Sequence, residues 1–232
     1  QAYHGRLINT VTSGNPAALI FDIIFDKENS FNYDLVNALT SENAPQNEAL
    51  ADVTGQFLVS NDPAIFLEAT YNSEKAYHAL VFEEEDTLNF LDKMETEPEG
   101  YYYESHIIHG ISAEAKSNLP QADRLGNTFV DLLSASVGAG SANFPQDEDG
   151  VIRRSPTAIY FEGPDHVYPS LVMSAAIDIL GIKKDGGFDY DFKNQVLRLI
   201  DTTNTVVREI PIDEHGRMYV NYYGPFQTFY YL

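Results

Sequence analysis

Apolar residues are spaced as in a helix near the start of the sequence and then form an unbroken run. The segment 3–13 places its aliphatic residues on one helical face, and Gly14 is expected to end that helix. Residues 17–25 follow as a nearly continuous apolar run with β-branched members, interrupted by Asp22. Such a run predicts a strand buried on both faces, as in a parallel sheet. The strand that should complete this first βα unit is expected before residue 3.

A second helix and strand repeat the pattern. Asp62 is expected to cap a helix over 63–72, because a proline occupies its first position, and the apolar segment 76–82 predicts another buried strand. Between the two units we expect a short helix at 34–39 and a short strand at 56–60. Helices that alternate with buried strands are typical of α/β folds.

The second half of the sequence predicts a different architecture. Residues 151–161 predict one strand after a turn at 146–150, and 168–180 predict a deeply buried helix with Pro169 at its first position. Three antiparallel strands are then expected at 195–201, 206–212 and 217–223. The sequence as a whole therefore predicts an α/β fold within one domain, 1–232. It would have a mixed sheet with βα units in the N-terminal half, flanking helices and a C-terminal antiparallel meander.

Charge narrows the range of partners. The 232 residues include 35 Asp and Glu against 14 Lys and Arg, giving a net charge of −21. This balance argues against binding to nucleic acid and against direct docking on an anionic membrane surface. Residues 83–104 are rich in acids and predict an exposed insertion. The absence of cysteine excludes disulfides and thiolate chemistry, and no apolar run is long enough to span a bilayer.

Asp22 and an arginine pair are the first candidate functional residues. A carboxylate inside a buried strand needs a partner, so Asp22 is interpreted either as a ligand-binding group at a strand end or as part of a structural ion pair. Arg153 and Arg154 are adjacent in a predicted strand and should point to opposite faces. One of them could reach a buried acid such as Asp22, while the other meets solvent or an anion.

Other catalytic and metal-binding patterns are weak. Asp147 and Asp149 resemble the first two ligands of a calcium loop, but the later ligands are absent. His106 and His109 are expected to be solvent-exposed and not to bind zinc. The sequence contains no nucleophile elbow and no phosphate-binding loop. We therefore expect no cofactor, no resident metal and no catalytic activity, with a cation at the two aspartates as the weak alternative.

Three segments carry a resemblance to a known family. They are GSANFPQDEDGVIRRSP (140–156), VYPSLVMSAAIDILG (167–181) and IPIDEHGRMYVNYYGPFQTF (210–229). In this order they resemble the second type of CHASE domain, a sensory extracellular module of bacterial cyclases and histidine kinases. The resemblance extends from about residue 5 to the end of the sequence. Its motif positions correspond to Asp22, Asp26, Asp147, Asp149, Gly150, Arg153, Arg154, Pro169, Ser170, Asn221, Tyr222, Gly224 and Pro225.

The resemblance implies the surroundings of the domain. Members have a transmembrane helix before the domain, further transmembrane helices after it, and a cytoplasmic effector such as a nucleotide cyclase or a kinase. The first strand of the family is expected before residue 3, and the acidic stretch 83–104 is longer than in other members.

The implied role is that of a non-catalytic, extracytoplasmic sensor for an unknown small molecule or ion. The candidate ligand-binding residues are Asp22, Arg153, Arg154, Asn221 and Tyr222. Two other functions are considered: a ligand-free module that holds receptors together as homodimers, and a metal-dependent hydrolase that uses Asp22 and the acids at 147–149.

Overall fold

A three-stranded parallel sheet forms the N-terminal half of the fold. The computed structural model describes residues 2–25, 63–83, 105–125, 129–147 and 149–220. The sheet order is β1-β2-β6, and a helix precedes each strand. The three helix–strand pairs are α1 (Ala2–Thr12) with β1 (Leu19–Phe21), α4 (Pro63–Ser73) with β2 (Ala76–Leu80), and α7 (Val130–Ala135) with β6 (Gly138–Ser141). The expected α/β class is confirmed.

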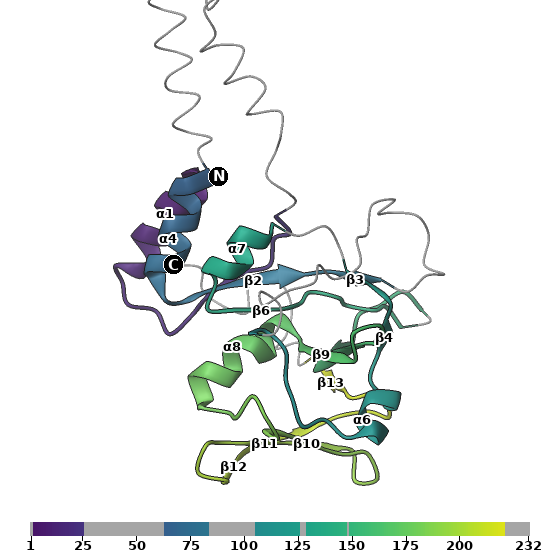
Figure 1. Cartoon of the computed structure of the whole chain (residues 1–232). Coiled ribbons are helices and arrows are strands. Elements are labelled where there is room, and N and C mark those ends of the chain that lie inside the picture. The colour runs from purple at the N-terminus through teal and green to yellow at the C-terminus, as the bar shows by residue number, and fades with distance from the viewer. Residues whose placement is uncertain (1, 26–62, 84–104, 126–128, 148, 221–232) are drawn as a thin grey trace, which may run out of the picture.

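Helices cover both faces of this sheet. Figure 1 shows α1, α4 and α7 on one side and α8 (Leu171–Leu180) on the other. All five residues of β2 are buried, since it is the central strand. Its side chains alternate: Ala76 packs with Phe66 of α4, whereas Tyr77 packs with Leu171 of α8. The result is a three-layer α/β/α arrangement around one parallel sheet.

The first strand is shorter and more exposed than its sequence predicts. β1 has three residues and lies at the edge of the sheet, paired only with β2 among the described strands. Ile20, Ile23 and Ile24 are 43%, 48% and 55% exposed. The prediction that 17–25 is buried on both faces is therefore wrong, because the strand has only three residues and Ile23 and Ile24 lie beyond its end. The helix before it also ends differently, since Asn15 and not Gly14 adopts the left-handed conformation.

Strand β6 is one of the elements that the sequence analysis missed. Its sequence, Gly-Ala-Gly-Ser, has little strand propensity, but small residues are needed where α8 crosses the sheet. A Cβ atom on Gly140 would lie 2.7 Å from the backbone N of Leu171, and one on Gly138 would lie 2.5 Å from Ser174 Oγ. The two glycines therefore allow helix and sheet to approach closely.

Helix α8 begins at Leu171, three residues after its expected start. Tyr168 and Pro169 end strand β9 (His166–Pro169), and Ser170 caps the helix by accepting a hydrogen bond from the backbone N of Met173. The placement of Pro169 inside the helix is therefore wrong, whereas Gly181 ends the helix in the left-handed conformation as expected. The helix is also less buried than predicted, because Val172 and Ile179 are about half exposed.

The C-terminal meander is built from a different set of strands than expected. β10 (Phe188–Asp191), β11 (Val196–Ile200) and β12 (Val206–Pro211) form it, and the first of these was not predicted. The third predicted strand appears as β13 (Arg217–Tyr219), which pairs with β7 (Arg154–Pro156) instead. The remaining described elements are β3 (Phe82–Glu83), α6 (Ala113–Asn118), β4 (Gln121–Ala122), β5 (Arg124–Leu125) and β8 (Ala158–Phe161).

Segment 151–161 was expected to be one strand but divides into β7 and β8 at Thr157. The backbone N and the hydroxyl of Thr157 both donate to the carbonyl of Gly216, at 3.2 and 2.6 Å. These bonds belong to the connection between β13 and β7, while β8 pairs with β9 and β4 in another sheet. The prediction of one strand was wrong because the residues before Thr157 pair with β13, whereas those after it pair with β9 and β4.

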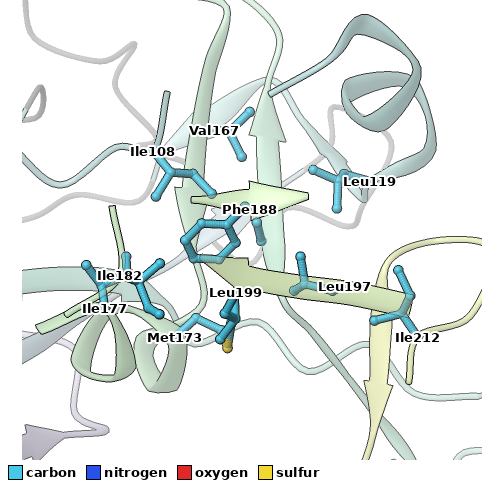
Figure 2. Packing of buried hydrophobic residues seen from close by; sticks show 11 residues of the cluster. Ile108, Leu119, Val167, Met173, Ile177, Ile182, Phe188, Leu197, Leu199 and Ile212 are labelled. Atoms are coloured by element: carbon cyan, nitrogen blue, oxygen red, sulfur yellow. The ribbon is translucent and has the colours of Figure 1, made fainter. Parts of the chain in front are cut away.

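One hydrophobic cluster joins the meander to the rest of the fold. Figure 2 shows Phe188, Leu197 and Leu199 of the meander facing Met173 and Ile177 of α8. Since the opposite face of α8 packs on the parallel sheet, this helix connects the two halves.

Several expectations fall outside the described residues: the helix at 34–39, the strand at 56–60 and nearly all of the acidic stretch at 83–104. Over the described ranges, no helix combines the length and apolar character needed to cross a membrane.

Substituting Gly140 with Ala should destabilise the protein by about 1–3 kcal/mol, because the new methyl group would overlap the start of α8. Gly163→Ala is the matched control, since a Cβ there has no neighbour within 4 Å. Urea unfolding of both variants measures the difference. Equal stabilities of the two variants would contradict the close approach of α8 to β6.

Candidate functional site

Asp22 lies at the carboxyl edge of the parallel sheet, directly after β1, but it is exposed. A solvated carboxylate needs no buried partner, so the interpretation of Asp22 as a buried charge is wrong. The expectation that an arginine of the 153–154 pair reaches it is also wrong, because both guanidinium groups bind other aspartates. Its position at the end of a parallel strand agrees with the expectation from the sequence.

Arg153 closes the turn that precedes it. Its guanidinium donates two hydrogen bonds to the carboxylate of Asp149, at 2.8 and 2.7 Å. Asp149 also accepts from the backbone N of Val151, while Gly150 has the positive φ that this turn requires. The hydrogen bonds from Arg153 and Val151 lower the pKa of Asp149 to about 2. The aspartates resembling calcium ligands therefore act here as acceptors for the arginines.

Arg154 links this turn to a distant one. Its Nε and Nη2 atoms donate to Oδ1 of Asp147, at 3.1 and 2.6 Å, and its Nη1 atom donates to Oδ2 of Asp213 at 3.0 Å. Arg217 binds the same Asp213 oxygen through Nε at 2.8 Å. Asp213 is therefore shared by two guanidinium groups from different strands, β7 and β13.

The backbone completes the environment of Asp213. Its other oxygen accepts hydrogen bonds from the backbone N atoms of His215 and Arg217, at 3.0 and 2.9 Å. Burial alone would raise the pKa of this carboxyl group, but the hydrogen bonds from Arg217 and His215 outweigh burial and hold the pKa below its usual value. The carboxylate is 2% exposed yet ionised, which makes it the anchor of this region.

We call Asp147, Asp149, Arg153, Arg154, Asp213 and Arg217 the arginine–aspartate network. Three positive and three negative side chains balance each other in it. Arg153 is the most accessible of its arginines, with a half-exposed side chain, whereas Arg154 and Arg217 are 25% and 15% exposed. Asn221 and Tyr222, the remaining predicted ligand residues, lie outside the described residues. Nor do the described residues gather three His, Asp or Glu side chains as a metal site would need.

A cavity of about 450 Å³ lies elsewhere, beside the turn of the β8–β9 hairpin. The segment 107–111 forms one wall, Lys116 of α6 another, and residues 164–167 of the hairpin a third. Lys116 Nζ contacts Asp165 Oδ1 at 2.6 Å, and the hydroxyl of Tyr160 donates to the same oxygen at 2.9 Å. Hydrogen bonds from Lys116 and Tyr160 lower the pKa of Asp165. No sequence motif indicated this cavity.

Buried histidines form a second feature that the sequence analysis missed. His78 of β2 is 1% exposed, stacks on Phe21 at 5.0 Å and has its Nδ1 atom 2.8 Å from Ser136 Oγ. His106 is 5% exposed and contacts the Leu133 carbonyl, so its predicted exposure was wrong. Burial lowers the pKa of His78 to about 3 and that of His106 to about 4. Both rings are therefore neutral near pH 7.

The comparisons with known proteins give one family. The model described as the CHASE2 domain matches residues 1–232, the whole sequence. No curated protein and no solved structure matches the chain. The family resemblance inferred from the segments around 140–156, 167–181 and 210–229 is confirmed.

Replacing Asp213 with Asn should lower the free energy of unfolding by about 3 kcal/mol, because two partly buried guanidinium groups would lose their shared negative charge. Asp149→Asn is the control: it breaks one exposed ion pair and should cost much less. Denaturant unfolding at pH 7 compares the two. A smaller loss for Asp213→Asn than for Asp149→Asn would show that the network is not anchored at Asp213.

Stability should fall as the pH drops from about 6.5 to about 4.5. In this window the unfolded chain protonates its histidines while buried His78 and His106 stay neutral, which costs about 2 kcal/mol per histidine. The variant His78→Phe should show a flatter dependence of unfolding free energy on pH. His215→Gln, which changes an exposed ring, should keep the steeper wild-type dependence. Identical slopes for wild type and His78→Phe would contradict this assignment.

Proposed function

Because the chain belongs to the CHASE2 family of extracellular sensory domains, we propose that it is the extracytoplasmic sensor of a bacterial transmembrane receptor. The receptor would carry a nucleotide cyclase or a histidine or serine/threonine kinase as its cytoplasmic effector. The observation that carries this proposal is the family match over the entire sequence. Membership supports a place in a receptor chain, and CHASE2 domains are generally non-catalytic.

The arginine–aspartate network supports a mechanical part in signalling. It fixes β13, the last described strand, to β7 and to the turn at 147–151 through one buried carboxylate. In the proposed receptor, β13 would come shortly before the transmembrane helices that follow the domain in the sequence. A strand held by charge-assisted hydrogen bonds moves with its neighbours, so a change in the domain core would reach the end of the chain.

The ligand-binding roles of Asp22, Arg153, Arg154, Asn221 and Tyr222 stay predictions. Arg153 is the best placed of the described members, because it is half-exposed and its partner Asp149 is exposed as well. An anionic signal that displaced Asp149 from this guanidinium would release the turn that contains Asp149 from Arg153. The homodimer remains the second candidate function, in which the domain holds two receptor chains together without a ligand.

The geometry gives little support to the metal-dependent hydrolase, because Asp22 is exposed and Asp147 and Asp149 accept hydrogen bonds from arginines. A serine–histidine contact does not support a hydrolase either. Ser136 Oγ and His78 Nδ1 form a contact that resembles part of a catalytic triad. Among the described residues, however, His78 Nε2 has no hydrogen-bond partner that would orient the ring, and the low pKa of His78 makes it a poor base. Ser136 donates its hydroxyl to the Leu132 carbonyl instead. The pair is better explained by packing between the sheet and the helices.

The full-length receptor in membrane vesicles provides the test. Effector activity is measured against a panel of amino acids, inorganic anions and divalent cations, for the natural receptor and for one in which residues 1–232 are replaced by an unrelated domain. We expect at least one probe to change the activity several-fold in the natural receptor only, since a ligand shifts a two-state equilibrium by its differential affinity.

If no probe changes the activity, and sedimentation shows a concentration-dependent dimer of the 232-residue chain, the dimerisation function replaces the sensor function. Loss of the dimer together with a retained response would support sensing alone.

A further inference from the structure

The cavity beside α6 has the size of a small-molecule site. Its volume of about 450 Å³ lies within the range of about 300–1,000 Å³ that is common for ligand pockets. The wall formed by 107–111 and 164–167 is held together by a β-bridge between Ile108 and Val167. It shares no residue with the arginine–aspartate network or with the predicted ligand residues. The cavity is therefore a separate feature that still needs a role.

A paired positive and negative charge lines the cavity. Lys116 and Asp165 form an ion pair at 2.6 Å in which the lysine side chain is 23% exposed and the aspartate 67%. Tyr160 fixes the aspartate through its hydroxyl, and the lysine Nζ lies 5.5 Å from the centroid of the same aromatic ring. The two charges are thus held in defined positions, and the lysine is less exposed than the aspartate.

This pairing selects against simple ions. An anion that approached Lys116 would be repelled by Asp165, and a cation at Asp165 would be repelled by Lys116. A molecule with one ammonium and one carboxylate group satisfies both side chains with charge-assisted hydrogen bonds. The remaining lining includes Ile107, Ile111 and Pro164, which offer apolar surface for a side chain.

The back of the cavity is part of the core that surrounds α8. Ile108 and Val167 line the cavity and also belong to the hydrophobic cluster that contains Met173 and Ile177. Figure 2 shows Ile108 and Val167 above Phe188, with Met173 and Ile177 of α8 below it. A ligand that moves the segment 107–111 would therefore act on residues packed against α8.

On the basis of the proposed sensor function, we infer that this cavity binds a small zwitterion, an α-amino acid or a dipeptide. Its carboxylate would contact Lys116, and its ammonium group would contact Asp165. Its side chain would lie against the isoleucine wall. The signal of this receptor would then belong to the class of amino-acid nutrients.

Binding to the purified 232-residue chain tests the site directly. Isothermal titration calorimetry with the twenty proteinogenic L-amino acids and a set of dipeptides of apolar residues should reveal at least one ligand. Its N-acetyl form lacks the ammonium charge and its methyl ester lacks the carboxylate charge. Each derivative should bind at least about tenfold more weakly than the parent compound. Equal binding of either derivative overturns the zwitterion assignment.

Matched variants locate the bound molecule. Asp165→Asn and Lys116→Met should each weaken binding roughly tenfold or more, because each removes one charge partner. Asp189→Asn and Lys183→Met remove the same charges from surface contacts outside the cavity and should bind like the wild type. Asp165 is largely exposed, so its variant should fold even if the lysine variant does not. Unchanged affinity in Asp165→Asn, or no binding of any probe by the folded chain, overturns the inference.

Effector assays of the full-length receptor distinguish a failure of the cavity assignment from a failure of the sensor function. If another probe, such as a divalent cation, changes effector activity equally in the natural receptor and in Asp165→Asn, the sensor function stands and the cavity assignment fails. If an amino acid binds the 232-residue chain but does not change effector activity at saturation, the binding site stands, and the proposal that the receptor senses this amino acid fails.

Discussion

Helix α8 has two buried faces, and the rest of the described fold depends on that constraint. Leu171 and Ala175 pack on the parallel sheet, while Met173 and Ile177 pack under the meander. A ten-residue helix can pack against two layers at once only if both layers approach its axis closely. The glycine strand β6 makes this possible on the sheet side, because a larger residue at Gly138 or Gly140 would meet the helix.

The polar features are distributed around this core in two separate places. The arginine–aspartate network fastens the C-terminal strand β13 to β7 and balances its own charges, within a chain of net charge −21. The cavity is lined in part by Ile108 and Val167 of the α8 cluster and holds an ion pair, Lys116 with Asp165. A sensor needs a place for a signal and a rigid connection to its output. In the proposed sensor, the cavity would receive the signal and the network would provide the connection.

The layer between the parallel sheet and the helices α1, α4 and α7 contributes stability and no obvious chemistry. His78 and His106 are buried in neutral form, and ring nitrogens in both lack hydrogen-bond partners within the described residues. Aromatic contacts surround His78, with Phe21 stacked on it and Phe66 at its edge. The desolvation that keeps these rings neutral also makes the layer sensitive to acid, because protonation would place a charge among phenyl rings.

The sequence by itself determined the first two helix–strand pairs of the parallel sheet, the turn at 146–150, the end of the helix at Gly181 and the family. These depend on local signals: apolar periodicity, turn residues and motifs within a few positions. It did not determine that Asp22 is exposed, that Arg154 binds Asp213, or that β13 leaves the meander to pair with β7. It also gave no indication of the cavity, whose walls come from segments around 107, 116 and 165. Only the tertiary structure decided these, because each depends on which distant segments lie side by side, and burial and ion pairing follow from that contact.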